Sequence, residues 1–450
     1  MKIKQFEDKN LSHYSYAILS ETSGEIILVD PARQPQPYLD YAKEQAASII
    51  GVIETHPHAD FVSSHLELQK LTGATIYVSK HMEPEFDFVS FDQGDLIEFG
   101  ELKLRALNTP GHSPDSISIV LTCEGEDKAV FTGDTLFIGD CGRPDLREQG
   151  EAVDLKREAL AKKMYKSLRD KLMLLGDQVI VYPAHGAGTL CGKALSEANS
   201  STIGAEKISN WSLQDMSEAD FVTALTTDQP FVPKYFPYDV SLNKAGAADW
   251  AASLATVAVG NTIKDAEAAD HLNPNILIID TRPSDPFKKQ HLKNSMNLMD
   301  GLKFETWLGS LVSPGDRFYL AAADEETLKV LMERTTKIGY EPFIEQAFVL
   351  DFGTENSAQL NLEDFKANPD HYTIVDIRNK SELGGQSVFE GSIQIPLPEL
   401  NSRFKEIPTN KPIVVHCAGG YRSAAGSSLL ENKLNAQVFD LSDHIKEFLA

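Results

Sequence analysis

Residues 55–61 read THPHADF, and this short stretch decides how the first half of the chain is interpreted. His56, His58 and Asp60 alternate along it, so imidazole and carboxylate groups that suit a transition metal are concentrated in one place. The stretch follows the β-rich run SIIGVIE (48–54), and loops at strand ends commonly carry the residues of a site. It therefore predicts the start of a metal site.

Three later stretches add residues of the same kind. TPGHSPDS (109–116), FTGDTLF (131–137) and YPAHGAG (182–188) supply His112, Asp134 and His185. The segments around them alternate β-rich runs with turns, which predicts strands at 25–30, 48–54, 74–79, 116–123, 128–137 and 178–185. Apolar residues at helical spacing predict helices at 39–47 and 155–175.

Taken in this order, the four stretches resemble the metallo-β-lactamase superfamily over residues 1–245. The resemblance implies an α+β fold, an αββα sandwich of four layers with the metal at one edge of its two sheets. Two-zinc hydrolases of the superfamily bind their second metal with the Asp and His of an H-x-H-x-D-H run. Here Phe61 occupies the last position of that run and cannot coordinate a metal.

The missing ligand favours one metal, held by His56, His112 and Asp134. Two histidines and one carboxylate with open positions suit Fe(II) and oxygen chemistry. The persulfide dioxygenases of the superfamily use the equivalent ligands for one Fe(II), so the resemblance implies one Fe(II) per chain. His58, Asp60 and His185 are then expected in supporting positions around the ligands.

The segment GDCGRPD (139–145) is similar to a CGR segment of the persulfide dioxygenases. The resemblance implies that Arg143 lies at the substrate entrance and anchors an acidic thiol carrier; an ordinary surface arginine is the alternative. Tyr182, beside His185, is expected to support the site or contact substrate, with a packing role as the alternative. Because Phe61 departs from the mitochondrial members, their substrate preference does not transfer to this chain.

The second half of the chain contains a repeat. Asp280 and Arg282 precede Asp376 and Arg378 by 96 residues, and YLAAADEE (319–326) precedes VVHCAGGY (414–421) by about the same distance. A constant offset predicts two copies of one small α/β domain around a parallel sheet, at 246–354 and 355–450. The Asp and Arg of each copy are expected to stabilise the domain rather than to react.

An apolar strand leads into Cys417, followed by a glycine-rich turn and a helix expected near Ser423. Such a turn forms an anion-binding nest, and the helix N-terminus favours the reactive thiolate. The loop Cys417–Arg422 resembles that of the rhodaneses, which implies sulfur transfer by Cys417 with Arg422. Substrate would be bound by Gly419, Gly420, Tyr421 and Ser423.

The first copy lacks these features, because Ala322 or Ala323 replaces the cysteine and acidic residues at 324–326 replace the glycines and arginine. That copy is interpreted as an inactive spacer or docking surface. Cys191 is a small packed residue or a sulfur relay beside the metal. Cys123 and Cys141 are expected to pack, and six further histidines are expected to be exposed or satisfied: His13, His65, His81, His271, His291 and His444.

The bulk composition limits the partners. The chain of 450 residues has a net charge of −24, which disfavours nucleic acid and anionic membranes. The polar start, the lack of an apolar run of bilayer length and four scattered cysteines favour a cytoplasmic protein. A homodimer or homotetramer is expected from the resemblance.

Together the two resemblances imply an enzyme that oxidises low-molecular-weight persulfides with O2 to sulfite, coupled to sulfur transfer through Cys417 that gives thiosulfate. The role would be sulfide and persulfide detoxification. One alternative is a zinc-dependent thioester hydrolase resembling glyoxalase II with a sulfur-carrier rhodanese tail. Another is a sulfur-carrier or scaffold module without dioxygenase activity. The thiol that carries the persulfide is left open between glutathione, coenzyme A and others. The direction of sulfur transfer is left open too, because thiosulfate could instead feed persulfide to the iron site through the same residues.

Overall fold

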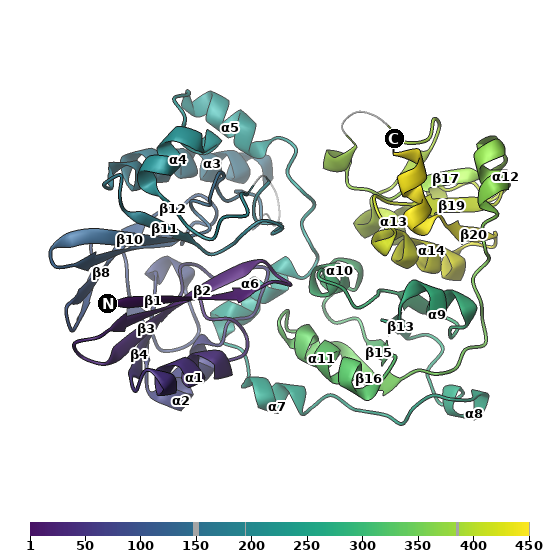
Figure 1. Cartoon of the computed structure of the whole chain (residues 1–450), viewed down its shortest axis with the longest axis horizontal. Helices are drawn as coiled ribbons and strands as arrows, with labels where there is room; N and C mark the ends of the chain where they lie inside the picture. Colours follow the sequence, from purple (N-terminus) through teal and green to yellow (C-terminus); the bar gives the residue numbers. More distant parts are fainter. Residues whose placement is uncertain (147–152, 194, 384–386, 450) are drawn as a thin grey trace. The chain divides into compact units, whose positions relative to one another are not determined.

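The structure is a computed structural model of the chain and describes residues 1–146, 153–193, 195–383 and 387–449. The chain forms two compact units (Figure 1), residues 1–252 with 337–339 and residues 253–336 with 340–450. No helix among the described residues combines the length and the hydropathy needed to cross a bilayer. The domain boundaries predicted after residues 245 and 354 stay predictions.

The first sheet of the first unit is antiparallel from β1 to β3 and parallel from β3 to β6. Its strands, in spatial order, are β1 (Lys2–Asp8), β2 (His13–Ser20), β3 (Glu25–Val29), β4 (Ser48–Ile53), β5 (Thr75–Val78) and β6 (Val89–Ser90). Helices α1 (Gln36–Glu44) and α2 (His65–Thr72) provide the crossovers that parallel pairing requires. Helix α1 begins three residues before its predicted start, and a proline in its first turn favours helical backbone there.

The second sheet is antiparallel except where β10 pairs with β11. Its order is β12 (Ser201–Thr202), β11 (Ile180–Pro183), β10 (Glu126–Gly133), β9 (Ile117–Cys123), β8 (Leu102–Asn108) and β7 (Leu96–Phe99). Helix α3 (Val153–Asp170) joins β10 to β11 and is shorter than predicted, because a 3₁₀ turn at Leu172–Leu174 follows it. All six predicted strands are present.

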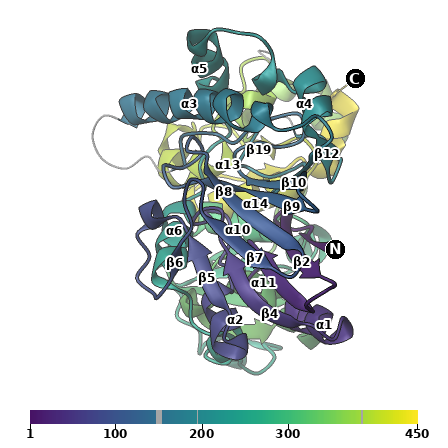
Figure 2. The same cartoon turned by 90° about the vertical axis from the view of Figure 1, so that its left-hand side faces the viewer.

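The two sheets face each other across one apolar core, to which Tyr16 and Ile27 contribute from one sheet and Leu104 and Phe131 from the other. Helices α1 and α2 pack on the outer face of the first sheet. Helices α3 and α5 (Glu218–Thr226) pack on the outer face of the second. Figure 2 shows this layering, which is the predicted αββα sandwich.

The second unit contains two sheets of four parallel strands with the same strand order. The first repeat has β14 (Ser295–Asn297), β13 (Leu277–Asp280), β15 (Phe318–Ala322) and β16 (Ile344–Val349); the second has β18 (Ile393–Gln394), β17 (Thr373–Asp376), β19 (Ile413–His416) and β20 (Val438–Asp440). Their helices are α9 (Ser284–Lys289), α10 (Phe304–Leu311), α11 (Glu325–Thr336), α12 (Leu362–Ala367), α13 (Leu397–Arg403) and α14 (Tyr421–Lys433). Among the described residues, the first unit also contains the short helices α4 (Ile203–Ser209) and α6 (Phe236–Ala245). Two more short helices, α7 (Trp250–Leu254) and α8 (Ala266–Ala269), lie along the chain between the sandwich and the first repeat.

The register of the sheets identifies the counterpart of Cys417 in the first repeat. Asp280 pairs with Ala321 on the next strand, and Asp376 pairs with His416 in the same way. The residues that follow, Ala322 and Cys417, therefore occupy equivalent positions. Of the two alanines that the sequence left open, the register selects Ala322.

Candidate metal centre and cysteine loop

Three strand ends bring His56, His112 and Asp134 together. His56 follows β4, His112 follows β8, and Asp134 follows β10 directly. All three side chains are buried. The Nε2 atoms of His112 and His56 lie 3.4 and 3.8 Å from Asp134 Oδ2. One ligand atom from each residue falls within 4.8 Å of the other two, which is a spacing that one metal ion can bridge.

The chemistry of this group fits a cation. Both carboxylate oxygens of Asp134 are buried without a hydrogen-bond partner, which is costly unless a charge compensates them. Burial raises the pKa of Asp134 to about 6. A divalent ion bound there would supply the missing counter-charge, and two histidines with one carboxylate suit Fe(II).

Hydrogen bonds orient both imidazoles. The His112 Nδ1 atom lies 2.9 Å from the backbone carbonyl oxygen of Arg143, so Nδ1 carries the proton. Thr55 donates its hydroxyl to Asp30 and can therefore accept from His56 Nδ1 at 3.0 Å. In both rings the Nε2 lone pair is left for a metal, as in metal sites that fix their histidine tautomers.

His58 turns away from these ligands. Its Nε2 atom lies 3.1 Å from both Asp30 Oδ1 and Glu54 Oε2. Burial alone would lower the pKa of His58, but these two carboxylates raise it well above the usual value. His58 thus contacts Asp30 and Glu54, and its expected support of the metal ligands stays a prediction. The sequence analysis did not single out Asp30 and Glu54, although each is the last residue of a predicted strand.

A second buried group lies next to the first and consists of Asp60, His185 and Cys191. The Nε2 atom of His185 is 3.4 Å from Asp60 Oδ2 and 3.5 Å from Asp134 Oδ1. Burial, together with Asp60 and Asp134, raises the pKa of Cys191 well above its usual value. Cys191 is therefore a neutral thiol when no cation is bound.

Phe61 fills the position of the absent ligand with an apolar ring. It stacks on His58 with 4.3 Å between ring centroids and on His13 with 3.8 Å. His13, which was expected to be exposed or satisfied, begins β2 and is buried beside the site. Burial lowers the pKa of His13 well below the usual value, so this ring is neutral.

The second candidate site is built around Cys417, at the end of β19. The backbone N–H groups of Gly419 and Gly420 point at the Cys417 sulfur, with N–S distances of 3.5 and 3.1 Å. Gly420 has a φ of 99°, which a residue with a side chain rarely adopts. Helix α14 begins at Tyr421, two residues before the predicted start, so its N-terminus faces the thiol and favours the thiolate.

Comparisons with known proteins agree with the folds described above. Residues 10–185 match the metallo-beta-lactamase superfamily, and residues 358–450 match the rhodanese-like domain. A solved metallo-beta-lactamase from Staphylococcus aureus subsp. aureus COL is 31% identical, and the likeness covers 78% of this chain and 99% of that one with a TM-score of 0.68. The chain belongs to the metallo-β-lactamase superfamily. A rhodanese-like domain forms its C-terminal part.

Two curated superfamily relatives have named activities. Persulfide dioxygenase ETHE1, mitochondrial, of Bos taurus is 30% identical over 184 residues, 40% of this chain and 66% of that protein. The cytoplasmic hydroxyacylglutathione hydrolase of Arabidopsis thaliana is 32% identical over 176 residues, 38% of this chain and 63% of that protein. The chain thus spans just under two thirds of the length of these relatives.

Arg143 is buried in the metallo-β-lactamase domain, so the alternative of an ordinary surface arginine is wrong, whereas its expected contact with substrate stays a prediction. Its side chain is 1% exposed and forms a bidentate pair with Asp145, with N–O distances of 2.6 Å. Its guanidinium also donates to the carbonyl oxygens of Pro230 and Leu190. A buried arginine needs such partners, and they fix the loop whose carbonyl orients His112.

Two other predicted contact residues are engaged elsewhere. Tyr182 packs between Phe131 and Tyr16, with ring centroids 5.4 and 5.2 Å away, in the core between the sheets. Ser423 is fully buried and donates its hydroxyl to the carbonyl oxygen of Gly420. Packing accounts for Tyr182, and support of the loop backbone accounts for Ser423.

Proposed function

We propose that the first unit oxidises the persulfide of a small thiol with O2 to sulfite, and that Cys417 exchanges sulfane sulfur with this sulfite to give thiosulfate. The observation that carries the oxidation is the buried convergence of His56, His112 and Asp134 on one point, with the Asp134 oxygens unpartnered. The persulfide dioxygenases among the relatives support the same chemistry.

In this proposal the three residues hold one Fe(II), which when bound supplies the redox chemistry that O2 requires. Overall, a persulfide, O2 and water give the thiol, sulfite and protons. His185 is the buried imidazole between Asp60 and Asp134, so it is positioned to move these protons. Phe61 places an apolar ring, and His13 a neutral one, on one side of the site.

The sulfur transfer follows from the geometry of the cysteine loop. The Cys417 thiolate attacks the sulfane sulfur of a persulfide, an S–S bond forms, and the electron pair leaves with the thiolate of the donor. Sulfite then attacks the outer sulfur of the Cys417 persulfide, and thiosulfate leaves while the Cys417 thiolate is restored. The N–H groups of Gly419 and Gly420 stabilise the negative sulfur at both stages.

Cys191 keeps its proposed role as a sulfur relay only if a bound cation lowers its pKa, because the thiolate is the nucleophile. The side chain packs within 4.8 Å of Asp60 and His185, so its alternative role as a small packed residue also fits. Cys191→Ser separates the two, since a relay predicts slower thiosulfate formation with unchanged metal content.

A zinc-dependent thioester hydrolase is the second candidate function, favoured by the hydroxyacylglutathione hydrolase relative and by the group of Asp60, His185 and Cys191 next to the first site. Metal analysis of the chain purified without added metal, combined with oxygen-electrode assays, decides between them. We expect about one iron per chain and oxygen uptake that requires a persulfide of glutathione, coenzyme A or another thiol. Two zinc ions and thioester cleavage without oxygen uptake would contradict the proposal.

A further inference from the structure

The pocket over Cys417 is shared by the two repeats of the second unit. It has a volume of about 380 Å³ and is lined by Cys417, Gly419, Tyr421 and Arg422 from one repeat and by Leu302, Lys303 and Trp307 from the other. We propose that Lys303 and Trp307 of the first repeat determine which sulfur donors and acceptors reach Cys417, and that they select small anions such as sulfite and thiosulfate. This inference rests on the proposed sulfur transfer by Cys417.

The segment that carries these residues is held closely against the cysteine loop. The Tyr421 hydroxyl donates to the carbonyl oxygen of Met299 at 2.8 Å. A Cβ atom on Gly301 would lie 2.8 Å from the Tyr421 ring, so only glycine permits this approach. Arg334, a residue of helix α11, donates to the Gly301 carbonyl oxygen at 2.6 Å and to Glu305 at 2.8 Å. The wall of the pocket is therefore anchored at both ends.

The charges of the pocket explain why a second cation matters. The Arg422 guanidinium donates to both carboxylate oxygens of Glu382, at 2.5 and 2.7 Å, so much of its charge is offset. Trp307 lies under the same guanidinium, 5.8 Å from ring centroid to Cζ, and keeps it at the pocket. Lys303 adds a positive charge from the opposite repeat. Together with the N–H groups of the loop, it favours a divalent anion over a neutral thiol.

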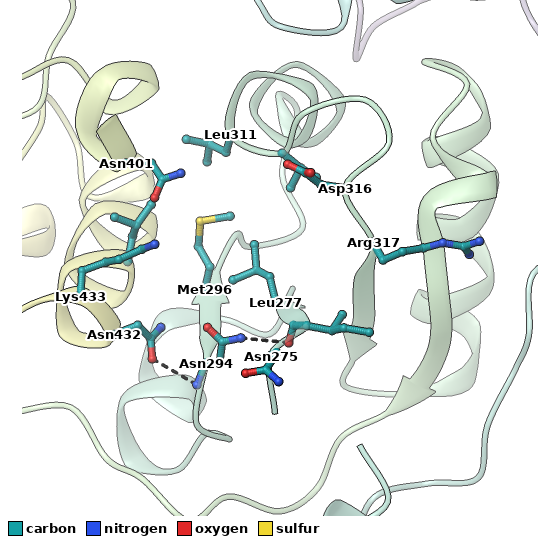
Figure 3. A pocket seen from close by; sticks show the side chains of 13 residues that line it. Asn275, Leu277, Asn294, Met296, Leu311, Asp316, Arg317, Asn401, Asn432 and Lys433 are labelled. Atoms are coloured by element: carbon teal, nitrogen blue, oxygen red, sulfur yellow. Dashed lines mark hydrogen bonds between the residues drawn. The ribbon is translucent and has the colours of Figure 1, made fainter. Parts of the chain in front are cut away.

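Another pocket shared by the two repeats contains cationic side chains but no nucleophilic cysteine among its lining residues (Figure 3). It is lined by four asparagines, among them Asn294 and Asn432, and contains no cysteine or histidine among its lining residues. Asn294 donates to the Ile276 carbonyl oxygen at 3.0 Å, and Asn432 accepts from the Asn294 backbone N–H at 3.1 Å. These amides join backbone segments, so this pocket stabilises the contact between repeats, whereas the Cys417 pocket contains the nucleophile.

The test uses the full chain, loaded with inorganic polysulfide, desalted, and then discharged by either sulfite or neutral dithiothreitol. Sulfite attack yields thiosulfate; dithiothreitol attack yields its cyclic disulfide and hydrogen sulfide. For Lys303→Ala we expect the sulfite concentration at half-maximal rate to rise about tenfold, the effect of removing one nearby charge, with an unchanged maximal rate. Lys303→Arg should keep the sulfite concentration at half-maximal rate near the wild-type value. The rate of discharge by dithiothreitol should be the same in wild type, Lys303→Ala and Lys303→Arg. The Cys417→Ser chain, treated in the same way, measures the sulfur carried by the other three cysteines.

The matched control is Lys264→Ala, an exposed lysine of the same repeat that does not line the pocket. Equal effects of Lys303→Ala on both acceptors, or no effect on sulfite, would overturn the inference. A wild-type chain that neither acceptor discharges would instead overturn the proposed sulfur transfer, and the inference with it. In the Cys417→Ser chain, sulfite should quench tryptophan fluorescence, and adding Trp307→Phe to that chain should abolish the quenching. Unchanged quenching after Trp307→Phe would contradict the place of Trp307 in the pocket wall.

Discussion

The two repeats of the second unit have the same sheet and the same buried ion pair but different loops. In both, four parallel strands have one order, and an arginine two residues after an aspartate pairs with it at 2.6 Å, Arg282 with Asp280 and Arg378 with Asp376. One strand then ends in Ala322 and the other leads into Cys417. The scaffold is thus separable from the chemistry, which requires a thiol and a glycine turn that exposes backbone N–H groups.

The largest expected effect comes from removing the chemistry of the second repeat. Cys417→Ser should reduce thiosulfate formation by at least about a thousandfold, because it removes the proposed nucleophile. Persulfide-dependent oxygen uptake should continue, with sulfite as the product. Sulfite and thiosulfate are quantified together with oxygen consumption. Cys123→Ser, at the end of β9, is the matched control and should leave both activities intact.

The same comparison can be tested in the reverse direction. Ala322→Cys places a thiol at the equivalent position of the first repeat, but the acidic residues that follow provide no glycine turn. In a Cys417→Ser background we therefore expect no recovery of sulfur transfer. Recovery would show that the scaffold alone activates a thiol.

Loss of the metal should abolish the proposed activity of the first unit and leave that of the second unit intact. His112→Ala removes one of the three proposed ligands, so metal content should fall and oxygen uptake should drop by at least about a hundredfold. Sulfur transfer from loaded Cys417 to sulfite should persist, because the cysteine loop contains no residue of the metal site. A chelator should have the same selective effect on the wild-type chain. His81→Ala, on the exposed surface, is the control.

If oxygen uptake survives in His112→Ala with full metal content, the ligand assignment is wrong. If all sulfur chemistry is unchanged, the chain acts as a carrier or scaffold module.

The shared ion pair should contribute to stability in both repeats. Asp280→Ala and Asp376→Ala each leave a buried arginine unpaired, and we expect each to destabilise its repeat by about 3–5 kcal/mol. Urea unfolding of the full chain, followed by far-UV circular dichroism, measures the loss. Asp443→Ala, on an exposed aspartate, should cost almost nothing. Markedly unequal losses would mean that the two scaffolds are not equivalent.

A smaller effect is expected at Glu382, which offsets the charge of Arg422. Glu382→Gln should lower the sulfite concentration at half-maximal rate by about threefold, in the opposite direction to Lys303→Ala. Burial would raise the pKa of Glu382, but Arg422 lowers it below 4.5. The stabilisation by the ion pair is therefore complete above the pKa that Glu382 has in the unfolded chain. It is lost as the pH falls through the lower pKa that Glu382 has in the folded chain, so assays between about pH 6 and about pH 8 do not titrate the pair. Unchanged sulfite dependence would contradict this role.

Much of the fold was predictable because its signals are local. Each predicted strand of the first unit is a short apolar run, and all six are present. The strands β1, β2, β7 and β8 were not predicted, because their polar residues at alternating or terminal positions weaken the signal. The strands β6 and β12 were not predicted either, because each has only two residues. The repeat was visible in the constant offset between Asp280 and Asp376. These two residues occupy equivalent positions in the two sheets of the second unit.

The sequence by itself determined the three residues that converge at the candidate metal site, and it determined the cysteine loop. His56, His112 and Asp134 sit at strand ends, where the sheet brings them to one edge, and the Cys417 turn depends on adjacent glycines. Only the tertiary structure decided which residues surround them. Asp30 reaches His58, Arg143 is buried, and Lys303 and Trp307 border Cys417. These contacts join residues far apart in the chain, and no spacing in the sequence records which surfaces meet when sheets and repeats pack.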